Sequence, residues 1–312
     1  TSFLVDLFHV DWVDPNNPMA LKIGFGRELT QISLQSAPKD LSHHGLFSAQ
    51  MVHAVAPNSN IELIQVLNSN VNGNLYTLIL AFYDNILKDL DNSPTVVNMS
   101  LGIRIPPPKA DFQLPTLGLE ALYSLIQVAH CRNIIVVAAA GNNSITSFPP
   151  ELAHLPADWS SVIGVAASNM ANQRSCFSNQ GEIAAPGGDG REPTGTPPPS
   201  ACDARLSDCP GLPAGECPFA IVGPIMKSAE YPTGLIYWEG SSFASPLVAG
   251  LAARILSESP VDLSPDEVRH IIECGATEAT FPQGIEGHPD RHIGEGVINV
   301  KRTLDQCMPP AQ

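Results

Sequence analysis

Short runs of aliphatic residues alternate along this chain with longer segments in which apolar residues recur every three or four positions. This alternation is typical of βαβ units that build a mainly parallel sheet. The short runs are compact and rich in Val, Ile and Leu, as expected for strands that are buried on both faces. They predict strands at residues 3–5, 61–67, 96–99, 134–138 and 162–166.

The longer segments predict helices that cover this sheet. In one of them Leu78, Phe82 and Ile86 fall on a single helical face. Another begins with Ser264 and Pro265, and proline is well tolerated at a first helical position because its missing N–H has no helical partner there. The predicted fold class is α/β, with a mainly parallel central sheet between helices. The helices are expected at residues 44–55, 75–90, 117–129, 242–256 and 264–274.

Two proline clusters, at residues 106–108 and 197–199, interrupt this order and predict surface loops. The second cluster lies in a stretch rich in Gly, Pro and Ser that also holds Cys202, Cys209 and Cys217. Neither an internal repeat nor a second periodic core is visible. Residues 1–312 are therefore expected to form a single domain with an insertion at about 188–238, whose composition argues against a packed core.

Composition excludes several classes of protein. Apolar residues make up 44% and charged residues 15% of the chain, which excludes extensive disorder. The net charge of −15 repels nucleic acid and anionic lipid, so neither is an expected partner. The apolar runs are shorter than the roughly 18 residues of a membrane-spanning helix. The seven cysteines match no zinc or redox spacing, and their odd number forbids complete pairing within the chain.

The segment with the clearest chemistry is residues 240–246, which reads GSSFASP and is followed by LVAGLAA. A serine here would lie at a helix N-terminus, where free N–H groups and the helix dipole favour negative charge. Taken alone, Ser241, Ser242 and Ser245 could simply be capping residues. The segment, however, closely resembles GTSMASP and the following VAG helix of the subtilisin-like serine proteases. The resemblance implies a three-layer αβα fold, a serine endopeptidase and Ser242 as its nucleophile.

The same resemblance assigns a base and an orienting carboxylate. The family's base opens a helix in a His-Gly pair, which corresponds to His44, with His43 as the alternative. The carboxylate ends the first core strand, which corresponds to Asp6. The family places a small residue and glycine after this aspartate, whereas Leu7 and Phe8 follow here. Two further aspartates near the N-terminus therefore stay open as alternatives, Asp11 and Asp14.

Residues for the oxyanion and the substrate follow from two further segments. The run IIVVAAAGN resembles the AAGN segment of the family and assigns Asn142 to the oxyanion hole, beside the N–H of Ser242. The run NMSLG resembles a strand whose edge binds extended substrate. Small, uncharged walls suit an apolar or moderately sized P1 side chain, with the pocket floor near residues 154–156. The expected walls are Ser100, Leu101 and Gly102 on one side and Ala139, Ala140 and Gly141 on the other.

These assignments predict an endopeptidase that acts on proteins or peptides, with an N-terminal propeptide as a further expected partner. No cofactor or metal is expected, because residues 44–57 offer no carboxylates where many relatives hold calcium; Asp189 is a weak alternative calcium ligand. The resemblance favours an extracellular protein, although no signal peptide is visible. The first alternative is a catalytically impaired binding or scaffold protein with this fold. An α/β-hydrolase esterase is disfavoured because no G-x-S-x-G sequence surrounds Ser242.

Overall fold

The computed structural model describes residues 43–68, 73–88, 93–104, 116–146, 149–189, 220–229, 231–279 and 290–310. Within these residues, a parallel sheet of four strands with the order β1-β2-β3-β4 forms the centre of the fold. Nearly every strand residue is buried, which explains why the strands read as continuous apolar runs. The strands are β1 (Val96–Met99), β2 (Ile135–Ala139), β3 (Ile163–Ser168) and β4 (Ile183–Pro186), and the first three confirm the predicted runs to within two residues.

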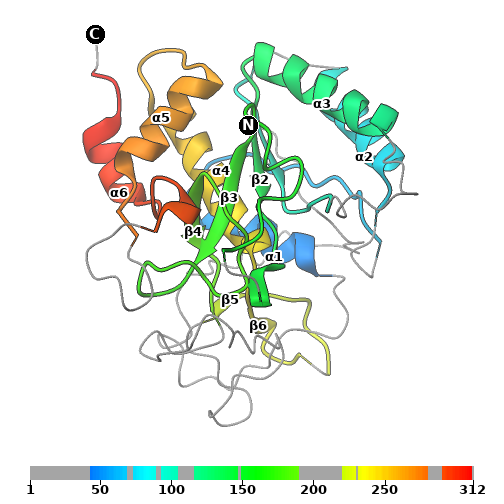
Figure 1. Ribbon diagram of the computed structural model, residues 1–312, viewed down its shortest axis with the longest axis vertical. Coiled ribbons are helices and arrows are strands. Elements are labelled where there is room, and N and C mark those ends of the chain that lie inside the picture. Colours follow the sequence, from blue (N-terminus) through cyan, green and yellow to red (C-terminus); the bar gives the residue numbers. More distant parts are fainter. Residues whose placement is uncertain are drawn as a thin grey trace.

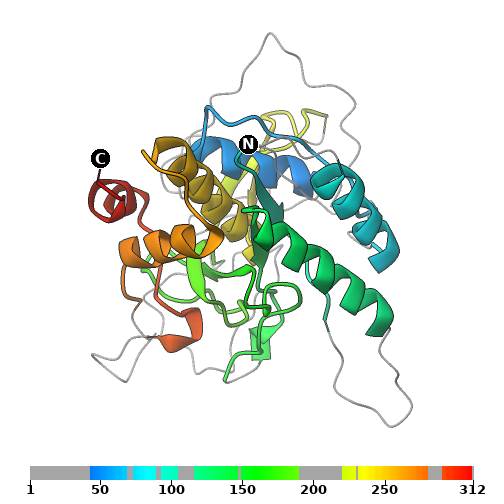
Figure 2. The same ribbon diagram turned by 90° about the horizontal axis from the view of Figure 1, so that it is seen from above.

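Alternate strand residues face two separate helical layers. Val96 and Ile135 point to a core shared with α1 (His44–Val55), α4 (Ser241–Glu258) and α5 (Pro265–Gly275). Val97 and Val136 point to the opposite core, which α2 (Leu75–Phe82) and α3 (Thr116–Cys131) cover. Figures 1 and 2 show α2 and α3 side by side on one flank of the sheet. The predicted three-layer α/β architecture is confirmed. None of the helices in the described ranges could cross a bilayer.

Two predicted elements differ from the structure. The helix expected at residues 75–90 is α-helical only to Phe82 and continues as the π-helix η2 (Tyr83–Leu87), while residues 89 and 90 lie outside the described ranges. Residues 61–67 carry isolated bridges at Ile64 and Leu67 rather than a strand. A strand forms only where a neighbouring segment pairs with it along its length. The described residues form isolated bridges with this segment, so it is not a continuous strand. The strand expected at residues 3–5 lies outside the described residues.

The last part of the predicted insertion is a buried hairpin. Strands β5 (Ile221–Pro224) and β6 (Leu235–Trp238) pair antiparallel. Val222 and Ile236 are fully buried, so the expectation that residues 188–238 lack a packed core is wrong for this part. Gly223 packs on the ring of Phe47 in α1, where an added Cβ would come within 2.5 Å of a ring carbon. Glycine is required here for close packing, although in the sequence it suggests a loop. Residues 190–219 lie outside the described ranges.

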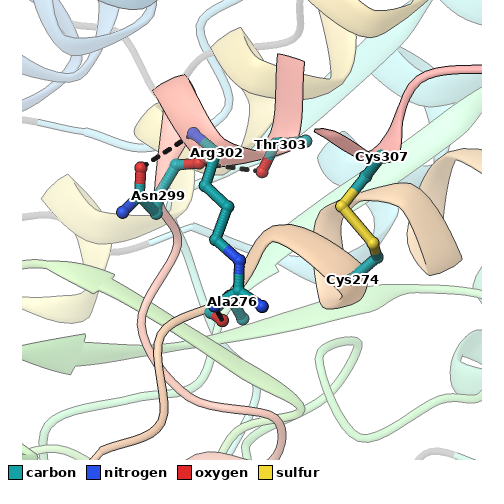
Figure 3. Close-up of a disulfide and its surroundings, with 6 residues drawn as sticks. All are labelled: Cys274, Ala276, Asn299, Arg302, Thr303 and Cys307. Atoms are coloured by element: carbon teal, nitrogen blue, oxygen red, sulfur yellow. Dashed lines mark hydrogen bonds between the residues drawn. A yellow bond between two sulfur atoms is a disulfide. The ribbon is translucent and has the colours of Figure 1, made fainter. Parts of the chain in front are cut away.

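The C-terminal segment is fastened to α5. Pro265 takes the first helical position of this helix, as the sequence predicts, and Ser264 and Glu267 also form a capping box there. After η4 (Arg291–Ile293), the helical turns α6 (Val300–Arg302) and η5 (Thr303–Cys307) pack against the end of α5. Figure 3 shows the disulfide between Cys274 and Cys307, with the guanidinium of Arg302 donating to the carbonyl oxygen of Ala276 at 3.1 Å. The disulfide and this hydrogen bond therefore hold the C-terminal turns α6 and η5 against the end of α5.

Removing the disulfide should destabilise the protein. The bridge joins residues 33 positions apart, so the Cys274→Ser/Cys307→Ser double variant should lose about 3–4 kcal/mol of unfolding free energy in urea. Cys131→Ser is the control, because Cys131 is free and exposed, and it should change stability by less than about 0.5 kcal/mol. Equal effects of the two changes would contradict the proposed role of the bridge.

A partly buried carboxylate links α5 to the sheet. Glu182, just before β4, forms an ion pair with Arg269 of α5 at 2.9 Å. Burial and the neighbouring Glu273 raise the pKa of Glu182 from 4.5 to about 7, although Arg269 opposes this rise. The folded state therefore binds a proton more tightly than the unfolded state between these two pH values. The stability supplied by protonated Glu182 is present below about pH 4.5 and is lost as pH rises through 7.

Glu182→Gln should consequently gain stability relative to the wild type as pH rises from 5 to 8, because glutamine resembles the protonated carboxyl. Melting temperatures measured across this range test the effect. Glu258→Gln is the control, since Glu258 also pairs with an arginine but is exposed. If the difference between Glu182→Gln and wild type does not change with pH, the raised pKa is refuted.

Candidate active site

Helix α4 lies between the sheet and α1, and residues 243–253 are all buried. Gly250 lets α1 approach closely, because a Cβ built there would lie 2.8 Å from the Cβ of Val55 and 3.0 Å from the carbonyl oxygen of Val52. A helix packed this tightly on its neighbours has little freedom to shift. The first turn of α4 is therefore a fixed platform for functional groups.

His44 lies beside this platform. It begins α1 and is 7% exposed. Its ring centroid is 5.1 Å from that of Phe243 and 5.7 Å from that of Trp238. His43 precedes the helix as its N-cap residue and is less buried. Of the two neighbouring histidines, His44 is the one whose ring packs next to the residue that follows Ser242.

Hydrogen bonds to its backbone carbonyl oxygen fix the position of Ser242. In a helix this carbonyl would accept a hydrogen bond from the residue four positions later, but that residue is Pro246, which has no N–H. The hydroxyl of Ser100 donates to the carbonyl oxygen instead, at 2.6 Å, and the hydroxyl of Ser48 lies 3.4 Å away. The Ser242 hydroxyl in turn donates to the carbonyl oxygen of Ser100 at 3.4 Å. Ser242 is thus hydrogen bonded to the residue that follows β1 as well as held within its own helix.

A buried polar network directs the Ser100 hydroxyl. The side-chain amide of Asn98 donates to Ser100 Oγ at 2.9 Å, and the hydroxyl of Ser245 donates to Asn98 Oδ1 at 3.0 Å. All three side chains are at most 2% exposed. Because Ser100 Oγ accepts from Asn98, its own proton is available for the carbonyl of Ser242. A fully satisfied network of this kind is rigid and costly to disrupt.

Asn142 lies on the other side of Ser242, just after β2. Its Oδ1 accepts the N–H of Ser241 at 2.9 Å, and the N–H of Gly141 donates to Ser241 Oγ at 3.0 Å. The first bond assigns the oxygen of the carboxamide and leaves its NH2 group as a donor. Gly141 and Gly240 have φ values of 108° and 151°, which favour glycine. Asn142 therefore presents N–H donors next to the free N–H groups at the start of α4.

A cleft of about 580 Å³ opens at the carboxyl ends of β1 and β2, and His44 is not among the residues that line it. In open α/β sheets ligands bind at this edge. Ser242 and Asn142 both line the cleft. So do most of the residues predicted to contact substrate: Ser100, Leu101, Gly102, Ala139 and Gly141.

Ala140 is the exception among the predicted wall residues. Its side chain is fully buried. Its N–H donates to the carbonyl oxygen of Val165 at 2.9 Å, and its carbonyl accepts from the N–H of His154 at 2.8 Å. Both of its backbone groups are occupied inside the protein. In this structure Ala140 supports the wall from behind, and its predicted contact with substrate stays a prediction.

His154 joins the two walls of the cleft at its floor. Its N–H bonds to one wall at Ala140, and the next residue, Leu155, bridges antiparallel to Ile103 beyond the other. Burial lowers the pKa of its imidazole; Glu151 raises this pKa and Arg104 lowers it. The sequence placed residues 154–156 near the floor, but it did not indicate that an imidazole would line the cleft.

Several predicted groups lie outside the described residues, namely Asp6 and its alternatives Asp11 and Asp14. The carboxylate partner of His44 therefore stays a prediction. Asp189 is 5% exposed and accepts the N–H of Cys176 at 3.2 Å. In the part of the chain that the structure describes, no three His, Cys, Asp or Glu residues are grouped as a metal site would require.

Sequence reasoning also missed the network of Asn98 and Ser245. Two signals could have revealed it. One is a polar residue, Asn98, inside an otherwise apolar strand. The other is Pro246 within a helix, which leaves the carbonyl of Ser242 without a helical donor.

A serine at the start of a central helix, beside a histidine that opens the neighbouring helix of a parallel α/β domain, is the arrangement of a subtilisin-like serine peptidase. Residues 30–296 match the subtilase family, and the chain belongs to this family. Family membership implies peptide substrates.

The chain is similar to two subtilisins in sequence and to a solved protease in fold. Subtilisin DY of Bacillus licheniformis is 29% identical over 283 residues, which cover 86% of this chain and 80% of the relative. Subtilisin of Bacillus pumilus is 30% identical over 277 residues, or 84% of this chain and 78% of the relative. Among solved structures, a lanthipeptide protease has a TM-score of 0.65 at 19% identity, covering 97% of this chain and 86% of that chain.

The contact between Ser100 and Ser242 can be tested by mutation. Ser100→Ala removes the 2.6 Å donor and should lower the unfolding free energy by about 1–3 kcal/mol, the cost of a buried unsatisfied carbonyl. Ser124→Ala is the control, because its exposed hydroxyl donates only within α3, and it should have little effect. Urea unfolding measures both. A Ser100→Ala variant as stable as the control would show that the contact contributes nothing to stability.

Proposed function

We propose that the chain is a serine endopeptidase that hydrolyses peptide bonds through an acyl-enzyme. Ser242 is the nucleophile and His44 the general base. Asp6 orients His44, and Asn142 with the N–H of Ser242 binds the oxyanion. The observation that carries the proposal is the convergence of the Ser242 hydroxyl and the Asn142 carboxamide on one cleft, with His44 packed beside the same helix turn.

The reaction begins when Ser242 Oγ attacks the carbonyl carbon of the scissile bond and His44 accepts the hydroxyl proton. Negative charge develops on the carbonyl oxygen. The NH2 of Asn142 and the N–H of Ser242 are donors that need no reorganisation to stabilise it, since the bond from Ser241 already orients the carboxamide. Collapse of the tetrahedral intermediate breaks the C–N bond, and the leaving amine takes the proton from His44.

Water then hydrolyses the acyl-enzyme in a second pair of steps, in which water is the nucleophile and the Ser242 oxygen is the leaving group. His44 removes a proton from the water, the hydroxide attacks the ester carbon, and the same two donors hold the second oxyanion. The Ser242 oxygen leaves and regains its proton from His44. The enzyme returns to its starting state without any cofactor.

Substrate is proposed to bind as an extended strand along residues 100–102. Ser100, Leu101 and Gly102 follow directly from β1 and line the cleft. An edge of this kind can pair with the backbone of a peptide, which gives affinity without demanding a particular sequence. Protein or peptide chains in extended conformation are therefore the proposed substrates.

Labelling with a fluorophosphonate tests the proposal, since such reagents react with a serine activated by a base and an oxyanion hole. Wild-type protein should be labelled at Ser242. Labelling should be lost in Ser242→Ala and His44→Ala. Asp6→Asn should slow it by orders of magnitude without unfolding the protein, because the amide favours the wrong tautomer of the imidazole.

Two further variants sharpen this test. His43→Ala is the matched control, since it removes the neighbouring histidine and should label almost normally. Asn142→Ala should fold normally but lower kcat on a peptide substrate by about 10²–10³-fold, the magnitude measured in subtilisin itself. If folded wild-type protein with an open cleft is not labelled at neutral pH, the peptidase proposal fails, and a scaffold protein with the subtilase fold replaces it.

A further inference from the structure

The imidazole of His154 occupies a confined position at the floor of the cleft. A Cβ built on Gly102 would lie 3.0 Å from its Nδ1, and one built on Gly141 would lie 2.8 Å from the same atom. These glycines belong to the two opposite walls. Any side chain larger than hydrogen at either position would press on the ring. Nδ1 of His154 therefore faces the space between the walls, where a substrate side chain would enter.

The other ring nitrogen points into the protein. Nε2 of His154 is buried and has no hydrogen-bond partner among the described residues. A buried N–H without an acceptor is rarer in proteins than an acceptor without a donor. The neutral ring therefore favours the tautomer that carries its proton on Nδ1. In this tautomer His154 presents an N–H donor to the cleft.

We propose that His154 selects the P1 side chain of the substrate by donating a hydrogen bond from Nδ1 to a side-chain amide oxygen, so that glutamine and asparagine are favoured over apolar residues. This inference rests on the proposed peptidase function and specifies its substrate. The small, uncharged walls alone suggest an apolar P1 side chain. The proposed donor at His154 replaces this expectation with a preference for Gln and Asn.

The charges near the floor favour an amide over a carboxylate. Arg104 also lines the cleft, but its guanidinium pairs with Glu151 at 3.0 Å, so its charge is largely compensated. A substrate carboxylate would gain most from a protonated imidazole. Burial lowers the pKa of His154 and outweighs the opposing effect of Glu151, so protonation is disfavoured. A carboxylate would accept the stronger hydrogen bond, but its charge would be desolvated without a cationic partner, so a neutral amide is the better match.

The test compares peptides that differ only at P1, carrying Gln, Asn, Glu, Leu or Phe. Fluorophosphonate titration gives the concentration of active enzyme, so that kcat/KM is obtained per active site. Wild-type enzyme should cleave the Gln and Asn peptides better than the Leu peptide. His154→Leu should lower the ratio of Gln to Leu cleavage about tenfold, since an apolar floor leaves the substrate amide unpaired.

Two variants separate a specific contact from a structural effect. His154→Gln keeps an N–H donor on a flexible side chain and should retain part of the preference for Gln. His270→Leu makes the same change as His154→Leu at an exposed histidine of α5, with 76% side-chain exposure, and should leave all ratios unchanged.

The outcomes distinguish this inference from the function on which it rests. Absence of labelling in wild-type protein refutes the peptidase, and this inference with it. Normal labelling with the same ratio of Gln to Leu cleavage in wild type and His154→Leu refutes the role of His154 alone. A wild-type preference for Glu over Gln would also overturn the inference, because it would indicate recognition by a charged imidazole.

Discussion

The hydrogen bond from the Ser100 hydroxyl to the carbonyl oxygen of Ser242 joins the two halves of the site. It exists because Pro246 removes the helical donor for that carbonyl, so a buried acceptor must find a partner elsewhere. The partner comes from the residue that follows β1. A helix and a strand far apart in sequence are thereby held in one position, and the cleft forms between them. Asn98 supports this position, since its amide donates to Ser100 Oγ and leaves the Ser100 proton available for the carbonyl of Ser242.

Parallel topology explains why the functional groups meet at one edge. Strands β1 and β2 run side by side in the same direction, so the segments that follow them, at Ser100 and at Asn142, leave the sheet at neighbouring points. The start of α4 lies against both. Glycine then determines how closely these segments approach, at Gly141 and Gly240 through positive φ angles and at Gly250 through contact with α1. Rigid backbone at the site is consistent with chemistry that depends on donors already in place.

Local patterns predicted much of the fold and several of the residues that line the cleft. Val96–Met99 is a strand with the predicted bounds, and Pro265 begins α5 where the sequence indicates. These features depend on residues close together in the chain, so periodicity and the preference for proline at a first helical position are sufficient to identify them. The hairpin of β5 and β6 escaped prediction because its glycines and prolines suggest a loop. Gly223, however, is needed there to pack against Phe47 of α1.

By itself, then, the sequence determined the class of fold and pointed to the candidate serine segment, since both follow from short, contiguous patterns. Only the tertiary structure decided which groups those patterns meet. It brought the imidazole of His154 between Gly102 and Gly141, turned Ala140 away from the cleft, and paired Cys274 with Cys307. Each of these depends on contacts between segments that are distant along the chain. Such contacts are chosen by packing and by the pairing of buried polar groups, and no local pattern specifies them.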